Sequence, residues 1–183
     1  VERSMFWDGS YYGGHTANAV AQPERKWVFA EGSQGFFDTY LLIANANSVD
    51  TTATVTFLRE NDTPVVKTIP VAAFARKTIH AGEFGELIGR AFGMVVEATQ
   101  PVIAERSMYF ASLPNRLWTG GHVNTGVTAP STSWFHAEGA TGSFFDTDIL
   151  LSNPQTTDAR IDLRFLLEDG TTIVKTKTLP AGQ

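Results

Sequence analysis

Two stretches of the chain, residues 52–57 and 160–165, alternate apolar and polar side chains with a period of two. Because successive side chains of a β-strand point to opposite faces, this pattern predicts strands with one buried and one solvated face. The polar face changes from threonines in the first stretch to two arginines and an aspartate in the second, while the other face stays apolar. Solvated positions tolerate such changes, so we expect Phe57 and Phe165 to be buried.

Other short apolar runs bounded by turn residues extend this into an all-β pattern. Six more strands are predicted at 27–30, 39–44, 65–69, 77–80, 94–98 and 102–110. This density of short strands is typical of a β-sandwich. Phe84, Leu87, Ile88 and Phe92 fit a short helix between strands instead. Asp169-Gly170 fits the two central positions of a type I′ hairpin turn, which both need positive φ.

The chain repeats itself. The segment Trp27–Asn45 returns as Trp134–Asn153, and the offset of 107 residues becomes 108 after one inserted residue. The segment Val1–Trp7 returns as Ala104–Phe110, and Gly-Gly-His follows both copies. A fixed period of this kind is the sequence signature of a repeat architecture.

The repeat divides the chain into three parts. Residues 27–133 form a complete sandwich unit, residues 1–26 are the terminal strand and linker of a preceding unit, and residues 134–183 are the beginning of a following one. Residues shared by both copies are expected to maintain a scaffold. Trp27 and Trp134 should therefore occupy equivalent environments.

Composition and charge exclude several functions. Charged residues make up 18% of the chain, below the roughly 25% of ordinary soluble domains, and the net charge of -5 includes no basic run. A nucleic-acid partner is therefore not expected. The sequence has no apolar stretch of the roughly 18 residues that span a bilayer. It has no cysteine, which excludes disulfides and thiol chemistry but leaves the cellular compartment open.

The motifs W-x-x-A-E-G, F-D-T, A-N and A-E-R-S-M recur along the chain. They resemble tandem Ig-like β-sandwich repeats of large secreted or cell-wall-associated bacterial surface proteins. The resemblance covers nearly the whole chain. It implies an extracellular or cell-surface location and a role in a stalk, a surface layer, a filament or adhesion, and it supplies no active site.

An arginine lies among the apolar positions of each A-E-R-S-M strand. Arg106 shares a face with Ala104, Met108 and Phe110, so it needs a carboxylate when it is covered. We expect that partner to be Glu31 or Asp38. By the same logic, Arg3 is expected to pair with Glu138 or Asp146, the copies of those acids.

This expectation leads to a hypothesis of strand exchange. Residues 134–183 stop before the closing strands of the unit, and Val1–Trp7 is a copy of one of them. Val1, Arg3, Met5 and Trp7 would complete the second sandwich by β-strand addition, either within one chain or between copies in a filament. The alternative is that the native polypeptide continues in both directions.

Catalysis is not expected. Glu31 and Asp38 were considered as a pair of catalytic carboxylates, but a pair that recurs in each copy of a scaffold favours a structural role. No catalytic residue, cofactor or bound metal is therefore predicted, because no two histidines share a ligand spacing. Calcium at Asp38 or Asp146 stays open, although the sequence has no D-x-D-x-D-G loop.

Four aromatic residues flank the glycine-rich segments that precede each new unit: Trp7, Tyr11, Tyr12 and Trp118. They favour a joint in which rings pack consecutive units together, with further copies of the chain as partners. The alternative is a carbohydrate-binding role, in which exposed rings stack on surface glycans.

Overall fold

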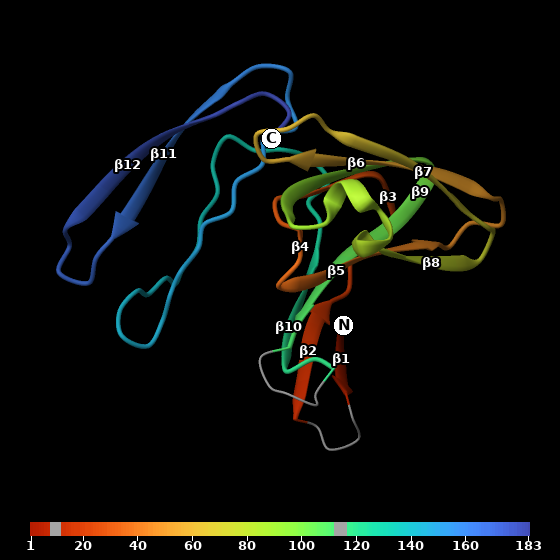
Figure 1. The fold of residues 1–183 in the computed structure, drawn as a ribbon, viewed down its shortest axis with the longest axis horizontal. Coiled ribbons are helices and arrows are strands. Elements are labelled where there is room, and N and C mark those ends of the chain that lie inside the picture. Colours follow the sequence, from red (N-terminus) through yellow and green to blue (C-terminus); the bar gives the residue numbers. More distant parts are fainter. Residues whose placement is uncertain (8–11, 112–116) are drawn as a thin grey trace.

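The computed structural model describes residues 1–7, 12–111 and 117–183, and shows an almost entirely β, sandwich-like fold (Figure 1). The strands before the long central strand are β1 (Glu2–Trp7), β2 (Gly13–Asn18), β3 (Glu24–Phe29), β4 (Ser33–Gln34), β5 (Phe37–Asn45), β6 (Thr51–Arg59), β7 (Val65–Val71) and β8 (Ala75–His80). Two 3-10 turns follow, η1 (Ala81–Glu83) and η2 (Gly85–Leu87). The remaining strands are β9 (Arg90–Phe110), β10 (Gly120–Thr125), β11 (Ala159–Leu166) and β12 (Thr172–Leu179).

Strand β9 organises the sandwich because it belongs to both layers. Its first half pairs with β6 on one side and β3 on the other, and β7 extends this layer beyond β6. Its second half pairs with β5 and β10, and β8 extends that layer beyond β5. All of these pairings are antiparallel. The sequence predicts two strands here, 94–98 and 102–110, whereas the chain runs through Pro101 as one bent strand.

The two layers enclose one hydrophobic core. Trp27, on β3, is 2% exposed and donates its indole N–H to the carbonyl oxygen of Val102 at 2.8 Å. Phe57, on β6, is 1% exposed and meets the ring of Phe92 edge to face. Burying side chains of this size is the main favourable contribution to folding. The predicted apolar face of 52–57 is therefore confirmed as the core face.

Two local predictions are wrong. Residues 84–92 do not form a short helix, because η2 ends at Leu87 and Gly89 takes a left-handed conformation (φ 70°) before β9 begins. The turn between β11 and β12 is not type I′, since only Gly170 of the pair has positive φ (83°). Gly170 instead donates to the carbonyl of Leu167, closing a longer loop with one left-handed residue.

The β1–β2 hairpin is a structural copy of the hairpin formed by the second half of β9 and β10. In one hairpin Met5 lies opposite His15 and Trp7 opposite Gly13, and in the other Met108 lies opposite His122 and Phe110 opposite Gly120. The glycines are required, since a Cβ at Gly13 or Gly120 would collide with the ring across from it. The Gly-Gly-His motif thus makes room for an aromatic ring over the neighbouring strand.

Residues 134–183 do not form a second sandwich. Their only strands in the part of the chain described are β11 and β12, which pair with each other and lie apart from the first unit (Figure 1). Trp134 is 58% exposed and Phe165 is 38% exposed, so the predictions of a shared Trp27 and Trp134 environment and of a buried Phe165 are wrong. The physical reason is that no counterpart of β9 pairs with this segment within the described residues.

Local hydrogen bonds nevertheless repeat between the two copies. The side-chain amide of Asn45 donates to the carbonyls of Val49, Val71 and Ala72. The amide of Asn153, its copy, donates to the carbonyls at the three matching positions. Thr39 and Thr147 also make matching bonds to the backbone before them. The shared F-D-T and A-N motifs therefore fix local turns, whether or not a core forms around them.

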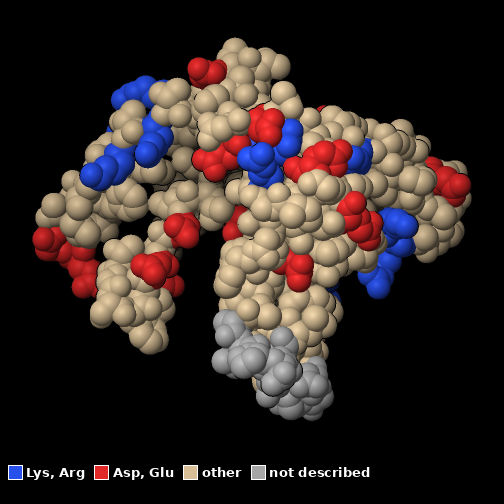
Figure 2. Space-filling model, viewed as in Figure 1, with Lys and Arg blue, Asp and Glu red and all other residues tan. Residues whose placement is uncertain are grey.

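Two further features concern the surface. On the face seen in Figure 2, Lys and Arg lie beside Asp and Glu over the complete unit, whereas at the left, over β11 and β12, the basic groups gather above the acidic ones. Across the described residues, no helix is both long and apolar enough to cross a membrane.

Candidate functional site

The outer face of the second layer carries a shallow groove of about 160 Å³. Residues that point away from the core alternate with core residues along β5 and β9, and they place rings and hydroxyls on this face. The groove is lined by Tyr40, Leu42, Thr78, Ser107, Tyr109 and Trp118. A larger hollow of about 360 Å³ lies at the other end of β5, but its lining consists of three alanines with Asn45, Phe74 and Arg76 and combines no ring cluster with hydroxyls.

The walls of the groove are aromatic rings that hold one another in place. Trp118 stacks on Tyr109 with centroids 4.5 Å apart and an interplanar angle of 24°. Tyr40 stacks on His80 at 4.6 Å and meets Tyr109 and Trp118 edge-on. Both stacked and edge-on arrangements are favourable for aromatic pairs. The walls are therefore preorganised without a ligand.

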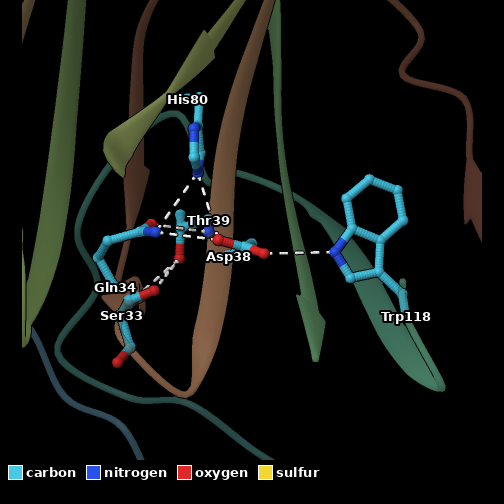
Figure 3. Close-up of polar contacts among 6 residues, drawn as sticks. All are labelled: Ser33, Gln34, Asp38, Thr39, His80 and Trp118. Carbon is cyan, nitrogen blue, oxygen red and sulfur yellow. Dashed lines mark hydrogen bonds and ion pairs between the residues drawn. The ribbon is translucent and has the colours of Figure 1, made fainter. Parts of the chain in front are cut away.

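A polar network fixes the orientation of Trp118 (Figure 3). Asp38 accepts the indole N–H of Trp118 at its Oδ2 (3.3 Å) and the side-chain amide of Gln34 at its Oδ1 (3.0 Å). The Nε2 atom of His80 lies 3.4 Å from the same Oδ1. Gln34 is buried and accepts the backbone N–H of Thr39. Asp38 therefore links β5 to the segment that carries Trp118.

The hydroxyl of Tyr40 is in its neutral form near pH 7. Burial raises the pKa of Tyr40, and the negative charge of Asp38 raises it further. The hydroxyl of Tyr40 therefore remains able both to donate and to accept a hydrogen bond. Ser107 and Thr78 add further hydroxyls to the lining.

On the inner side of the same layer, Arg106 forms the ion pair expected from the sequence. Its Nη1 lies 2.7 Å from Glu31 Oε2 and also donates to the Glu31 carbonyl oxygen. Its Nη2 donates to Nδ1 of His122 at 3.0 Å, which requires that nitrogen to be unprotonated. Burial lowers the pKa of Arg106, with Glu31 opposing the shift. Asp38, the other candidate partner, binds Trp118 instead.

The β1–β2 hairpin packs on the outer face of the complete unit beside the groove. Its Trp7 donates to the carbonyl of Trp118 at 3.2 Å and meets the ring of Tyr109 edge-on at 5.8 Å. His15 lies 2.9 Å from the hydroxyl of Tyr109. We call these contacts, together with the ion pair between Arg3 and Glu105, the hairpin joint.

Arg3 completes the hairpin joint through Glu105, at 2.8 Å. The structure therefore does not pair Arg3 with Glu138 or Asp146, and strand exchange within the chain is not formed. The reason is geometric: Arg3 and Trp7 lie over β9, where they contact Glu105 and Tyr109. In addition, β1 copies only the second half of β9, so it could close only one layer of a second sandwich.

The remaining candidates of the N-terminal segment are Tyr11, Tyr12, Val1 and Met5. Tyr12 meets the ring of Trp7 edge-on at 6.4 Å, so it belongs to the joint. Tyr11 lies outside the described residues, while Val1 and Met5 are exposed. No group of three or more metal-ligating side chains occurs within the described ranges.

Sequence reasoning missed most of the groove. Tyr40, His80 and Tyr109 were not candidates, because the motifs drew attention to residues that recur in both copies. A usable signal exists: Tyr40 and Tyr109 occupy outward-facing, partly solvated positions of alternating strands, where large rings are unusual. The register of the paired strands decides which of these rings lie side by side in the groove.

Comparisons with known proteins concern the fold. No family model matches the chain, and no curated protein matches it. Among solved structures, Thermotoga maritima 1070 has a TM-score of 0.53 and 21% sequence identity, with 58% of this chain and 96% of that chain covered. Anabaena sensory rhodopsin transducer has a TM-score of 0.43 and 16% identity, covering 48% and 99% respectively. The first likeness shows that the sandwich is shared, and neither carries a functional argument.

Proposed function

We propose that the chain is part of an extracellular repeat protein with a structural or adhesive role, in which consecutive units pack through the hairpin joint. The internal repeat supports an array. The resemblance of its motifs to bacterial surface proteins supports the location. Copies of the chain are the expected partners, assembling as a stalk, a surface layer or a filament.

The observation that carries the proposal is the hairpin joint itself. The β1–β2 hairpin belongs by sequence to a preceding unit, yet it packs on β9 and β10 of the complete unit through Trp7, His15 and Arg3. A ring cluster with three polar contacts restrains the angle between neighbours more than a flexible linker does. A stiff array of units needs such a restraint.

Amide hydrogen exchange on the full chain tests the joint, because it reports local opening. Trp7→Ala is expected to speed exchange at β2 and leave β5 and β9 unchanged. Met5→Ala, a matched change at an exposed position of the same hairpin, should leave β2 protected. Free exchange throughout β2 in the unaltered protein would mean that no joint forms in solution.

Electron microscopy of native material tests the array. Extended strings or fibres with a regular bead spacing are expected, and accessibility of the protein to protease on intact cells should follow. Compact isolated particles confined to the cell interior would contradict the proposal. Light scattering of the purified chain distinguishes strand exchange between copies, which produces a concentration-dependent mass, from an array held within one polypeptide.

A further inference from the structure

We propose that the groove lined by Tyr40, Ser107, Tyr109 and Trp118 is a binding subsite for a neutral saccharide, with one sugar ring placed against the aromatic walls. This goes beyond the proposed array, because the groove lies within one unit and requires no second copy. It also differs from glycan binding at the joint rings, because Tyr40 and Ser107 take no part in the joint.

The shape and lining of the groove fit a sugar ring. Tyr40, Tyr109 and Trp118 present aromatic surface around a hollow of about 160 Å³, with Leu42 beside them. The C–H faces of a pyranose pack on aromatic surface, while its hydroxyls need hydrogen-bonding groups at the edge. The mutual stacking of the walls means that little ordering is required on binding.

Ser107 supplies the observation that points to a ligand. Ser107 as a whole is only 4% exposed and lines the groove, its hydroxyl is not among the fully buried side-chain atoms, and it makes no hydrogen bond within the part of the chain described. A hydroxyl that opens on the groove without a protein partner is free to bind a ligand. The Tyr40 hydroxyl, at the wall, likewise has none among the described residues. A sugar hydroxyl can satisfy either group as donor or acceptor.

The charges around the groove select a neutral ligand. No lysine or arginine lines it, so it lacks the cation that a phosphate, sulfate or carboxylate would need. Asp38 lies behind Trp118, and the negative charges of Asp38 and Glu83 both act on Tyr40. An acidic sugar would therefore be repelled.

The repeat indicates that the groove is not required by the fold. Several residues with structural contacts in the complete unit are identical in both copies, as Glu31 and Glu138 or Asn45 and Asn153 illustrate, although the buried Gln34 is replaced by Thr141. Tyr40, in contrast, is replaced by Asp148 in the second copy, although the residues around it match. Tyr40 therefore occupies a partly solvated position at which the fold does not require an aromatic ring.

The same replacement gives a well-matched test variant. Tyr40→Asp introduces a residue that the repeat already carries at this position, and Leu166→Asp adds the same charge at an exposed position of β11. Trp118 is unsuitable, because it also serves the hairpin joint. Ser107→Ala removes only the serine hydroxyl that lines the groove. Circular dichroism establishes that each variant is folded.

The experiment is a titration of the full chain with maltohexaose, cellohexaose and chitohexaose, followed by NMR of the Trp118 indole and the Ser107 amide. At least one hexasaccharide is expected to shift both signals. Tyr40→Asp should weaken that binding at least tenfold and Ser107→Ala several-fold, while Leu166→Asp leaves it unchanged.

Three outcomes would overturn the proposal. They are the absence of shifts at millimolar saccharide, equal affinity of the unaltered chain and folded Tyr40→Asp, and binding of a polyproline peptide alone, which would make the groove a peptide site. None of them affects the hairpin joint, whose own test is hydrogen exchange at β2, so the two proposals fail separately.

Discussion

The two copies of the repeat share a sequence but differ in burial. In the complete unit Trp27 and Phe57 are inside the core, whereas their copies Trp134 and Phe165 are exposed. Yet Asn45 and Asn153 make the same three hydrogen bonds in both places. Local turns are therefore encoded within each motif, and the core depends on β9, which pairs with β3, β4, β5, β6 and β10.

The largest difference is expected between the two phenylalanines. Phe57→Ala should lower the free energy of unfolding by about 3–5 kcal/mol, because it empties a fully buried site. Phe165→Ala should cost less than about 1 kcal/mol, since that ring already contacts solvent. Urea denaturation of each full-length variant measures both. Equal losses would mean that residues 134–183 bury a core in solution.

The two arginines should differ next. Arg106→Ala removes a buried guanidinium and leaves the partly buried Glu31 without its cation, and it should cost about 3 kcal/mol. Arg3→Ala removes a partly exposed pair with Glu105 and should cost at most about 1 kcal/mol. A double-mutant cycle of Arg106 with Glu31, followed by urea denaturation, isolates the pair. Additive losses would show that the two side chains do not interact.

The two asparagines should behave alike locally and differ globally. Asn45→Ala leaves three carbonyls near the core without their donor, and we expect a loss of about 2 kcal/mol in unfolding free energy. Asn153→Ala should leave that value unchanged but release the amide of Gln155, which Asn153 now binds. Hydrogen exchange at Gln155 provides the second measurement. Continued protection there would contradict the equivalence of the two turns.

The smallest effect is a pH dependence confined to the complete unit. Burial lowers the pKa of His122, the charge of Arg106 lowers it further, and Glu31 opposes both. The unfolded chain therefore binds the proton first, so stability is full above a pH of about 6.5 and falls as the pH drops through the folded-state pKa. His122→Asn should flatten this slope in urea midpoints measured between pH 5 and pH 8. An unchanged slope would mean that another group causes the pH dependence. His15 is the next candidate, because burial lowers its pKa too.

Much of the fold follows from the sequence because alternation and repetition are local properties. The core face of residues 52–57 follows from the alternation of side chains along one strand. The same alternation indicates that Arg106 needs a carboxylate, Glu31 or Asp38, and the structure selects Glu31. The continuity of β9 through Pro101 could not be predicted, because it depends on pairing with strands far away in the chain. The groove was missed for the same reason, since Tyr40 and Trp118 meet only after β5 and β9 pair.

The continuity of β9 also has a consequence for how a unit responds to load. Because β9 is central to both layers, it cannot leave one layer without disrupting the other. Neither layer of the unit can therefore unfold before the other. Stretching should therefore produce a single abrupt rupture per unit in a force-extension trace, rather than a gradual yield. An array of such units would absorb energy in discrete steps and recover one unit at a time.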